Sequence, residues 1–362
     1  MFSWNGKGLT IGNLTARIPI IQGGMGVGIS LSGLASAVAN QGGIGVISTA
    51  GIGMLEPGFS SDFLEANINA LRKEIRKARE FTKGILGVNI MVAMSNFADM
   101  VKTAIEEGID IIFSGAGLPL NLPSYLRETM QTKLVPIVSS ARAAALIAKN
   151  WYKKYKYTPD AIVVEGPMAG GHLGFSHEQI TDPDFRLENL IPEVVQEAKR
   201  MEDAVSRPVP VIAAGGIYTG EDIHKFIQLG ASGVQMATRF VTTVECDASD
   251  EFKKAYTDCK KEDIGIIKSP VGMPGRAIIN GFIEDVNAGK KKPYKCPYHC
   301  IVTCNQETSP YCIALALMNA KQGKMKNGFA FSGENAYKTD EIIPVEKLID
   351  TLTEEYNSAV LT

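Results

Sequence analysis

Short apolar runs of strand length alternate with longer segments of helical periodicity over about two thirds of this 362-residue chain. Such alternation is typical of βαβ units, in which helices join parallel strands. Eight runs read as strands, at residues 18–22, 44–48, 85–90, 109–114, 135–139, 161–165, 209–213 and 233–237. Seven segments between them read as helices, at residues 31–40, 62–79, 96–107, 122–131, 141–155, 187–205 and 220–229. Several of these follow Ser, Thr, Asn or Asp, which cap the free N–H groups of a first helical turn.

Eight consecutive β-then-α units predict an α/β protein with a (β/α)8 TIM barrel. A doubly wound open sheet is the alternative. Beyond residue 251 the sequence becomes polar and rich in turns, apart from a helix-like stretch at 313–321. We therefore predict a barrel over residues 1–262 and a C-terminal extension over 263–362, which carries a cysteine cluster and packs on the barrel.

Composition narrows the classes of partner. Hydrophobic residues make up 45% and charged residues 21%, which suits a globular core, and the net charge of -2 lacks the basic patch that nucleic acid or anionic membranes require. The N-terminus does not read as a signal peptide, and no run of 18 apolar residues occurs. We expect a cytoplasmic protein with a small-molecule substrate. The oligomeric state is left open, a homodimer being one option.

Glycine-rich turns follow several of the predicted strands, where barrels place their active sites. Gly215 and Gly216 follow the seventh strand and Thr238 the eighth, a pattern that suits a phosphate-bearing cofactor, although a simple tight turn is the alternative. The first strand leads into GGMGVG, whose glycine spacing differs from the GxGxxG of a dinucleotide fold, and no acid ends the second strand. A flat ring lying on the glycine backbone at 23–26 fits this turn better.

His172 is one of four histidines and lies in a glycine-flanked loop just beyond the sixth strand. An imidazole there can donate or exchange a proton near neutral pH, which makes it the candidate catalytic residue. A structural loop histidine is the alternative. His177 is the rival candidate, whereas His224 and His299 are expected to be structural.

Five ordered motifs, IPIIQGGMG, GVNI, EGPMAGGHLG, PVIAAGGI and GVQMATRFVTTVEC, span about residues 14–280. Together they resemble the nitronate monooxygenase (2-nitropropane dioxygenase) family and its sister, the FMN-dependent enoyl-acyl carrier protein reductases. The resemblance implies an FMN-dependent oxidoreductase with one FMN per barrel and His172 as the catalytic histidine. It also implies a set of cofactor-binding residues, namely Gly24, Met25, Asn89, Ser139, Glu165, Gly170, Gly171, Gly215, Gly216, Ala237 and Thr238.

Three hypotheses for the function follow, of which the third comes from a different class. The first is oxidation of alkyl nitronates or nitroalkanes with O2 to carbonyl compounds and nitrite. The alternative is a reductase in which NAD(P)H reduces FMN and the flavin reduces an enoyl thioester or a quinone; acyl carrier protein is a partner only in that case. The third is a flavin-binding or redox-sensing module whose cysteine-bearing tail contacts another protein.

The tail carries four of the six cysteines, spaced Cys296-x3-Cys300-x3-Cys304-x7-Cys312. Spacing of four would align three thiols on one face of a helix that begins near Pro297. Thiolates so placed could bind zinc or an iron–sulfur cluster, although the usual ligand pairs are two residues apart. The alternative is reduced cysteines that pack as small hydrophobic side chains.

Overall fold

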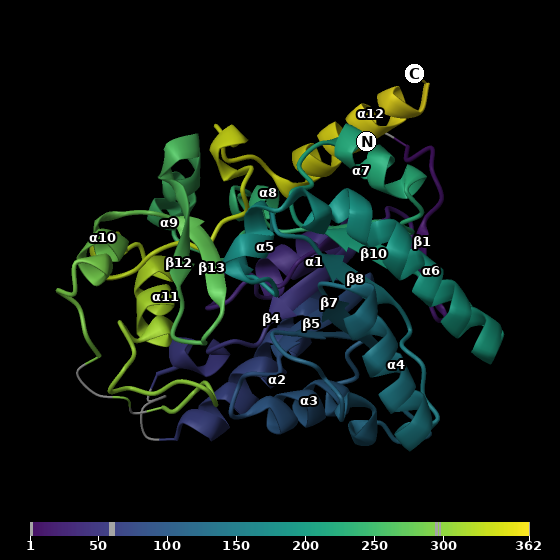
Figure 1. The fold of residues 1–362 in the computed structure, drawn as a ribbon, viewed down its shortest axis with the longest axis horizontal. Helices are drawn as coiled ribbons and strands as arrows, with labels where there is room; N and C mark the ends of the chain where they lie inside the picture. The colour runs from purple at the N-terminus through teal and green to yellow at the C-terminus, as the bar shows by residue number, and fades with distance from the viewer. Residues whose placement is uncertain (1–2, 58–61, 294–295, 297, 362) are drawn as a thin grey trace.

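The computed structural model describes residues 3–57, 62–293, 296 and 298–361. At its centre eight parallel strands close into a barrel (Figure 1), which confirms the predicted (β/α)8 fold and excludes the open sheet. In barrel order, with β11 pairing back to β3, the strands are β3 (Ile20–Gln22), β4 (Ile44–Ser48), β5 (Ile85–Met91), β6 (Ile111–Gly115), β7 (Lys133–Val138), β8 (Ile162–Glu165), β10 (Val211–Ala214) and β11 (Gly233–Met236).

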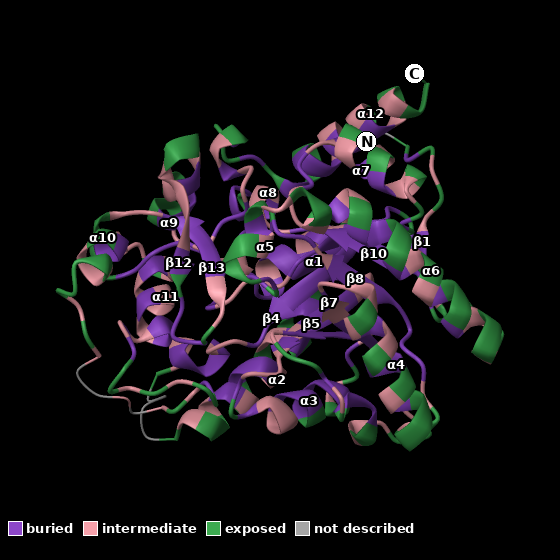
Figure 2. Ribbon diagram, in the orientation of Figure 1, coloured by how far each residue is buried: buried purple, intermediate pink, exposed green. Residues whose placement is uncertain are grey.

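Apolar side chains fill the barrel and close its lower end. Val46, Phe113 and Val163 belong to one buried cluster inside the strands. A short hairpin of β1 (Leu9–Ile11) and β2 (Leu14–Ala16) adds Leu9 and Ile11 to the same cluster. Figure 2 shows the buried strands enclosed by helices that expose only their outer sides. The rigid core leaves the opposite, C-terminal end of the strands free to form a site.

Six predicted helices surround the strands, as α1 (Ser32–Asn40), α2 (Phe63–Phe81), α3 (Phe97–Glu106), α4 (Ala141–Tyr155), α6 (Leu187–Val205) and α7 (Gly220–Gln228). Asp62 and Ser140 accept hydrogen bonds from the first turns of α2 and α4, and Thr219 forms a capping box with Asp222 at α7. These caps satisfy N–H groups that have no partner inside the helix.

The predicted helix at 122–131 is wrong. A single 3-10 turn, Leu122–Tyr125, forms there, Leu126 is extended, and a turn follows at residues 128–129, closed by the Met130 amide donating to the Arg127 carbonyl (2.9 Å). Side chains of α4 hold the chain just before this segment: the Trp151 indole N–H donates to the Pro119 carbonyl (2.9 Å) and the Tyr155 hydroxyl donates to Asn121 (3.2 Å). These tertiary contacts outweigh the local helical pattern.

The last helix of the chain, α12 (Val345–Leu361), packs against both α7 and α1 and so completes the ring after the short α8 (Thr238–Val241). Figure 1 shows it beside α7 and near the N-terminus. Glu355 accepts a hydrogen bond from the Gly220 amide (2.7 Å), and Tyr356 stacks on Trp4 with ring centroids 3.9 Å apart. The domain boundary at 262/263 stays a prediction, but the final part of the extension covers the barrel wall.

The remaining segments lie around the C-terminal ends of the strands. They comprise α5 (His177–Thr181), α9 (Asp250–Thr257), α10 (Gly281–Asn287), α11 (Ile313–Lys321), β12 (Ile264–Lys268), β13 (Pro274–Ile278) and 3-10 turns at Ile52–Leu55, Pro183–Phe185, Lys261–Asp263, Met325–Asn327 and Ala336–Lys338. α11 has the bounds that the sequence predicts. β12 and β13 form a sheet with β9 (Gly171–His172), in which His172 pairs with Gly275. The tail is thereby joined to the loop of the candidate catalytic histidine.

The helix predicted for the cysteine loop does not form in its described part. Ile301 pairs with Met94 in an isolated β-bridge, and the Val302 amide donates to the Ala93 carbonyl (2.9 Å). Lateral bonds of this kind replace the i to i−4 bonds of a helix. Pro297, the predicted helix start, lies outside the described residues. None of the helices in the described chain is long and apolar enough to cross a membrane.

Candidate active site

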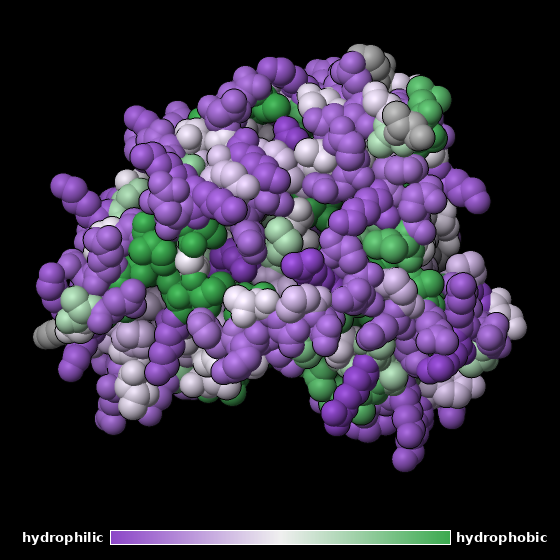
Figure 3. All heavy atoms as spheres, turned by 45° about the horizontal axis from the view of Figure 1, so that its top comes forward, coloured by the Kyte–Doolittle hydropathy of each residue, from purple (hydrophilic) through white to green (hydrophobic). Residues whose placement is uncertain are grey.

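A cavity of about 220 Å³ opens at the C-terminal ends of the barrel strands. Nine of the twelve predicted site residues line it, namely Gly24, Met25, Asn89, Glu165, Gly170, Gly171, His172, Ala237 and Thr238. The space-filling view shows a mainly hydrophilic surface in which hydrophobic residues gather in recessed patches (Figure 3). Counting the other lining residues, seven of the eight barrel strands or the turns that follow them contribute to this one site, as the barrel fold requires.

The turn after β3 forms one wall because its glycines permit close packing. A Cβ at Gly24 would lie 2.4 Å from the Asn89 Cβ, and one at Gly26 would lie 2.8 Å from the Ala50 Cβ. The Ser30 hydroxyl accepts a hydrogen bond from the Met25 amide (2.8 Å) and holds the turn. The bare backbone leaves a surface on which a flat ring can lie.

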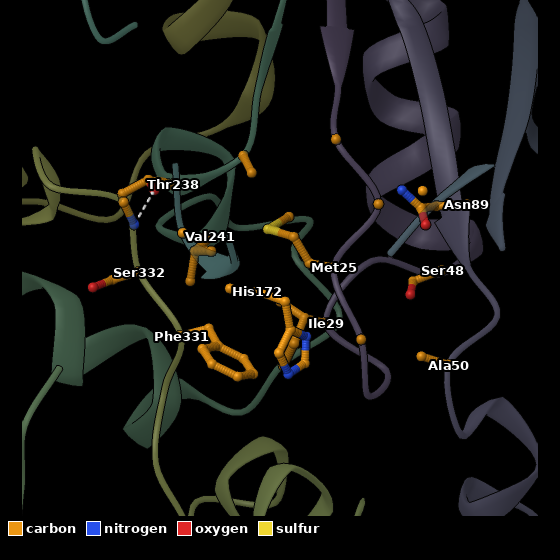
Figure 4. A pocket seen from close by; sticks show the side chains of 18 of the residues that line it. Met25, Ile29, Ser48, Ala50, Asn89, His172, Thr238, Val241, Phe331 and Ser332 are labelled. Atoms are coloured by element: carbon orange, nitrogen blue, oxygen red, sulfur yellow. Dashed lines mark hydrogen bonds between the residues drawn. The ribbon is translucent and has the colours of Figure 1, made fainter. Parts of the chain in front are cut away.

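Asn89 and Glu165 bring polar groups to the inner end of the cavity. The Asn89 carbonyl accepts hydrogen bonds from the backbone and side chain of Thr49, while its amide side chain faces the cavity (Figure 4). Burial raises the pKa of Glu165 to about 7, so much of this carboxyl keeps its proton at neutral pH. The pair offers a donor and an acceptor to the polar edge of a bound cofactor.

His172 stands on the opposite wall beside Phe331, with ring centroids 5.0 Å apart (Figure 4). Its Nε2 lies 2.6 Å from the Oγ of Ser269, which also accepts a hydrogen bond from the Val271 amide (3.2 Å). The Ser269 hydroxyl can donate to a neutral Nε2, in which case the ring proton resides on Nδ1. Burial lowers the pKa of His172 to about 4. The ring is a neutral hydrogen-bond donor at physiological pH.

The tail forms the wall that the sequence did not reveal. Phe331, Ser332 and Gly333 line the cavity, and the Tyr256 hydroxyl donates to the Phe331 carbonyl. A Cβ at Gly170 would lie 2.5 Å from the carbonyl carbon of Ser332, so only glycine permits this approach. The one sequence signal that could have indicated this wall was the polar, glycine-containing segment SGEN at 332–335, which lies far from the barrel motifs in the sequence.

Arg276, which is buried, fastens the histidine loop to the tail. Its guanidinium donates to the carbonyls of Pro167 and Ala169, the latter at 3.0 Å, and pairs with Glu334 at 3.1 Å. Burial lowers the pKa of Arg276 while the Glu334 carboxylate opposes that shift. Arg276 was not among the site residues predicted from the sequence.

The predicted phosphate end is only partly assembled around the cavity. Ala237 and Thr238 line it at the start of α8, and the Thr238 hydroxyl accepts a hydrogen bond from the Gly333 amide (3.0 Å; dashed line in Figure 4). Gly215 and Gly216, with φ of 94° and 83°, do not line it but pack against the 166–169 loop. Their predicted role in phosphate binding stays a prediction.

Other candidates lie away from the cavity. Ser139 donates to the Gly174 carbonyl (3.0 Å) and so holds the loop that follows His172. His177 begins the exposed α5, His224 packs against the Tyr356 ring, and His299 lies in the tail loop. The rivals to His172 are therefore outside the cavity.

The residues present fit a flavin. The glycine turn offers a flat surface, Asn89 and Glu165 offer polar groups, and Gly170 approaches Gly333 closely beside Thr238. A family model described as nitronate monooxygenase matches residues 8–355. The chain belongs to the nitronate monooxygenase family. This membership confirms the prediction of an FMN-dependent oxidoreductase.

Relatives and solved structures agree with this family. A probable nitronate monooxygenase of Staphylococcus aureus (strain Newman) is 30% identical over 310 residues, covering 78% of this chain and 81% of the relative. One from Staphylococcus saprophyticus is 29% identical, with 76% and 79% covered. The structure of FabK from Thermotoga maritima matches with a TM-score of 0.72 and 28% identity over 95% of this chain and 94% of that one. Nitroalkane oxidase from Streptomyces ansochromogenes, 21% identical with a TM-score of 0.71 and coverage of 95% and 97%, shares the fold.

Proposed function

We propose that this nitronate monooxygenase family member oxidises alkyl nitronates with O2 to carbonyl compounds and nitrite. The observation that carries the proposal is His172, which lines the cavity, is kept neutral by burial and has Nε2 hydrogen-bonded to Ser269. With its ring proton on Nδ1, this ring would donate to an anionic substrate. A donor placed in a water-poor cavity stabilises an anionic nitro group better than it would in bulk water.

Bound FMN would supply the electron acceptor, and the chain's own residues would bind and orient the substrate. Two nitronate anions and one O2 balance to two carbonyl compounds and two nitrite ions. His172 would hold the nitronate oxygens through Nδ1–H, while Phe331 and Met25 exclude water from the reacting carbon. The low pKa of His172 makes the ring a weak base, so we expect the preformed nitronate to be preferred over the neutral nitroalkane.

The second candidate is an NAD(P)H-dependent reductase acting on an enoyl thioester or a quinone. It is supported by the likeness to FabK, which extends over 95% of the chain at an identity close to that of the staphylococcal relatives. Acyl carrier protein enters as a partner only under this candidate.

Anaerobic mixing of the FMN-loaded protein with each reductant separates the two candidates. We expect the flavin absorbance to be bleached rapidly by a nitronate such as propyl-2-nitronate, and only slowly by NADH or NADPH. Rapid bleaching by a nicotinamide cofactor, together with none by nitronate, would overturn the proposal in favour of the reductase.

A further inference from the structure

The walls of the active-site cavity carry no fixed positive charge. Among the described residues that line it there is neither a lysine nor an arginine, and the carboxyl and imidazole groups are those of Glu165 and His172. Burial raises the pKa of Glu165 to about 7 and lowers the pKa of His172 to about 4, so neither group is cationic at neutral pH. A second anionic group on a substrate would therefore meet no counterion inside this cavity.

The cationic side chains on the neighbouring elements do not line the cavity. Arg276 donates to carbonyls of the histidine loop and pairs with Glu334 at 3.1 Å. Arg239 of α8 and the buried Lys253 of α9 each donate to a backbone carbonyl at 3.0 Å. Lys321, the last residue of α11, lies near the turn after β3. These cations are thus held by other partners or lie behind the cavity walls.

A bound metal cation would be the other possible counterion for an anionic substituent. Within the described part of the chain, no group of three or more His, Cys, Asp or Glu side chains could hold a metal ion. The metal site predicted for the four cysteines of the tail is therefore not formed there. The cavity has to recognise the far end of its substrate without positive charge.

Large apolar and aromatic side chains from α9, α11 and the tail line part of the cavity. They are Phe252 and Tyr256 of α9, Leu317 of α11, and Phe331. The Tyr256 hydroxyl donates to the Phe331 carbonyl, so the polar atom of this side chain is already bound to backbone. The Phe331 ring packs edge to face on Phe329, with centroids 4.9 Å apart. The wall is thereby fixed in place and presents mainly hydrocarbon.

The polar groups of the cavity lie mainly where the cofactor is expected to bind. Asn89 and Glu165 are at its inner end, and Thr238 is at the predicted phosphate end. His172 stands instead beside Phe331 (Figure 4). A substrate whose reacting anion is held by His172 would extend its remaining atoms along the apolar wall. A methylene group gains free energy on leaving water for such a wall, whereas a carboxylate without a partner loses much more.

We propose, on the basis of the nitronate oxidation proposed for this site, that the cavity selects nitronates whose substituent is uncharged and apolar, and that Leu317 is a specificity-determining residue. Selection works by exclusion, because a carboxylate on the substituent would lose its hydration and gain no counterion. Leu317 is half-buried and stands on a regular helix, so the character of its side chain decides what this wall accepts.

The test compares two nitronates of the same shape on the FMN-loaded, full-length protein. One is the nitronate of 4-nitrobutanoate, and the other is 4-methylpentyl-1-nitronate, in which an isopropyl group replaces the carboxylate. Under anaerobic conditions we expect the second-order rate constant of flavin bleaching to be at least about a hundredfold larger for the isopropyl compound. The Kd values of the two parent nitroalkanes, taken from the perturbation of the flavin spectrum, should differ in the same direction without any turnover.

Leu317→Lys tests the assigned residue. A lysine can keep its methylene stem on the wall while its ammonium group reaches the substituent, so the preference for the isopropyl compound should shrink at least about tenfold. The matched control is Leu315→Lys, which alters a half-buried leucine of the same helix that lines a surface pocket instead of the cavity. This control should keep the wild-type preference.

Equal rate constants for the two nitronates in the wild-type protein would overturn the selectivity but leave nitronate oxidation intact. Bleaching by neither compound would overturn the proposed function, and the selectivity with it. A folded Leu317→Lys protein with the wild-type preference would refute the role of Leu317. The wild-type comparison decides the selectivity even if that variant does not fold.

Discussion

At the residue scale, the candidate site depends on a few side chains whose charge is set by burial. His172 and Glu165 come from the two ends of one loop, and burial favours the neutral form of each. Both residues were identified from the sequence because they stand in a motif just beyond a strand. Their ionisation states could not be predicted from the sequence, because the pKa of each group depends on the tail segments that enclose the cavity. Ser269, which is hydrogen-bonded to the imidazole, lies 97 residues further along the chain.

The Ser269→Ala substitution tests that contact. Loss of the hydroxyl frees Nε2 and lets the ring proton move between the two nitrogens, so we expect kcat/KM for the nitronate to fall about tenfold, near 1.4 kcal/mol. FMN affinity should change little. Ser358→Ala, which removes an exposed serine of α12, is the control. Equal kinetics for the Ser269 variant and wild type would show that the serine does not orient His172.

Glu165→Gln tests the buried carboxyl through the pH dependence of stability. The folded-state pKa of about 7 lies above the ordinary value of 4.5, so the unfolded chain loses this proton first as pH rises. The wild-type apoprotein should therefore lose stability between pH 4.5 and 7, by up to about 3 kcal/mol.

Glutamine keeps the shape of the carboxyl without ionising, and the other titrating groups are common to both proteins. The variant should thus melt at a higher temperature than wild type at pH 8, and the gain should fade toward pH 4.5. Thermal unfolding at the two pH values measures it. A gain of the same size at both would refute the buried ionisation.

At the element scale, the eight strands and most helices could be predicted because each repeats a local pattern of burial and capping. The helix at 122–131 could not be predicted correctly, since tertiary contacts of α4 with Pro119 and Asn121 fix the chain where that segment begins. The helix predicted for the cysteine loop was wrong for a similar reason, because the backbone of this loop bonds to residues 93–95 rather than within itself. Periodicity reports which face of an element is buried, but not which neighbour competes for its backbone.

The final helix provides a prediction at this scale. Leu352 of α12 is fully buried where this helix packs on α7 and α1, so Leu352→Ala should lower the free energy of unfolding by about 2–5 kcal/mol. Leu361→Ala, in the same helix but 85% exposed, should change it by less than about 0.5 kcal/mol. Denaturant unfolding of both variants gives the comparison. Similar losses for the two would mean that α12 is not part of the barrel wall.

At the scale of the whole molecule, a barrel supplies the strand ends and a tail folds back over them. The twelve site residues predicted from the barrel motifs include nine that line the cavity, yet Phe331, Ser332 and Gly333 were missed because no barrel pattern extends to the tail. β9, β12 and β13 join the two parts into one sheet, so that the histidine loop and the tail share hydrogen bonds. Cofactor binding and tail folding should consequently be linked.

The central claim is that this cavity holds one FMN against the glycine turn after β3. Titration of the apoprotein with FMN, followed by quenching of flavin fluorescence, tests it most directly. We predict saturation at one FMN per chain, accompanied by a rise in the unfolding temperature. A protein that is isolated colourless and takes up no added FMN would contradict the claim.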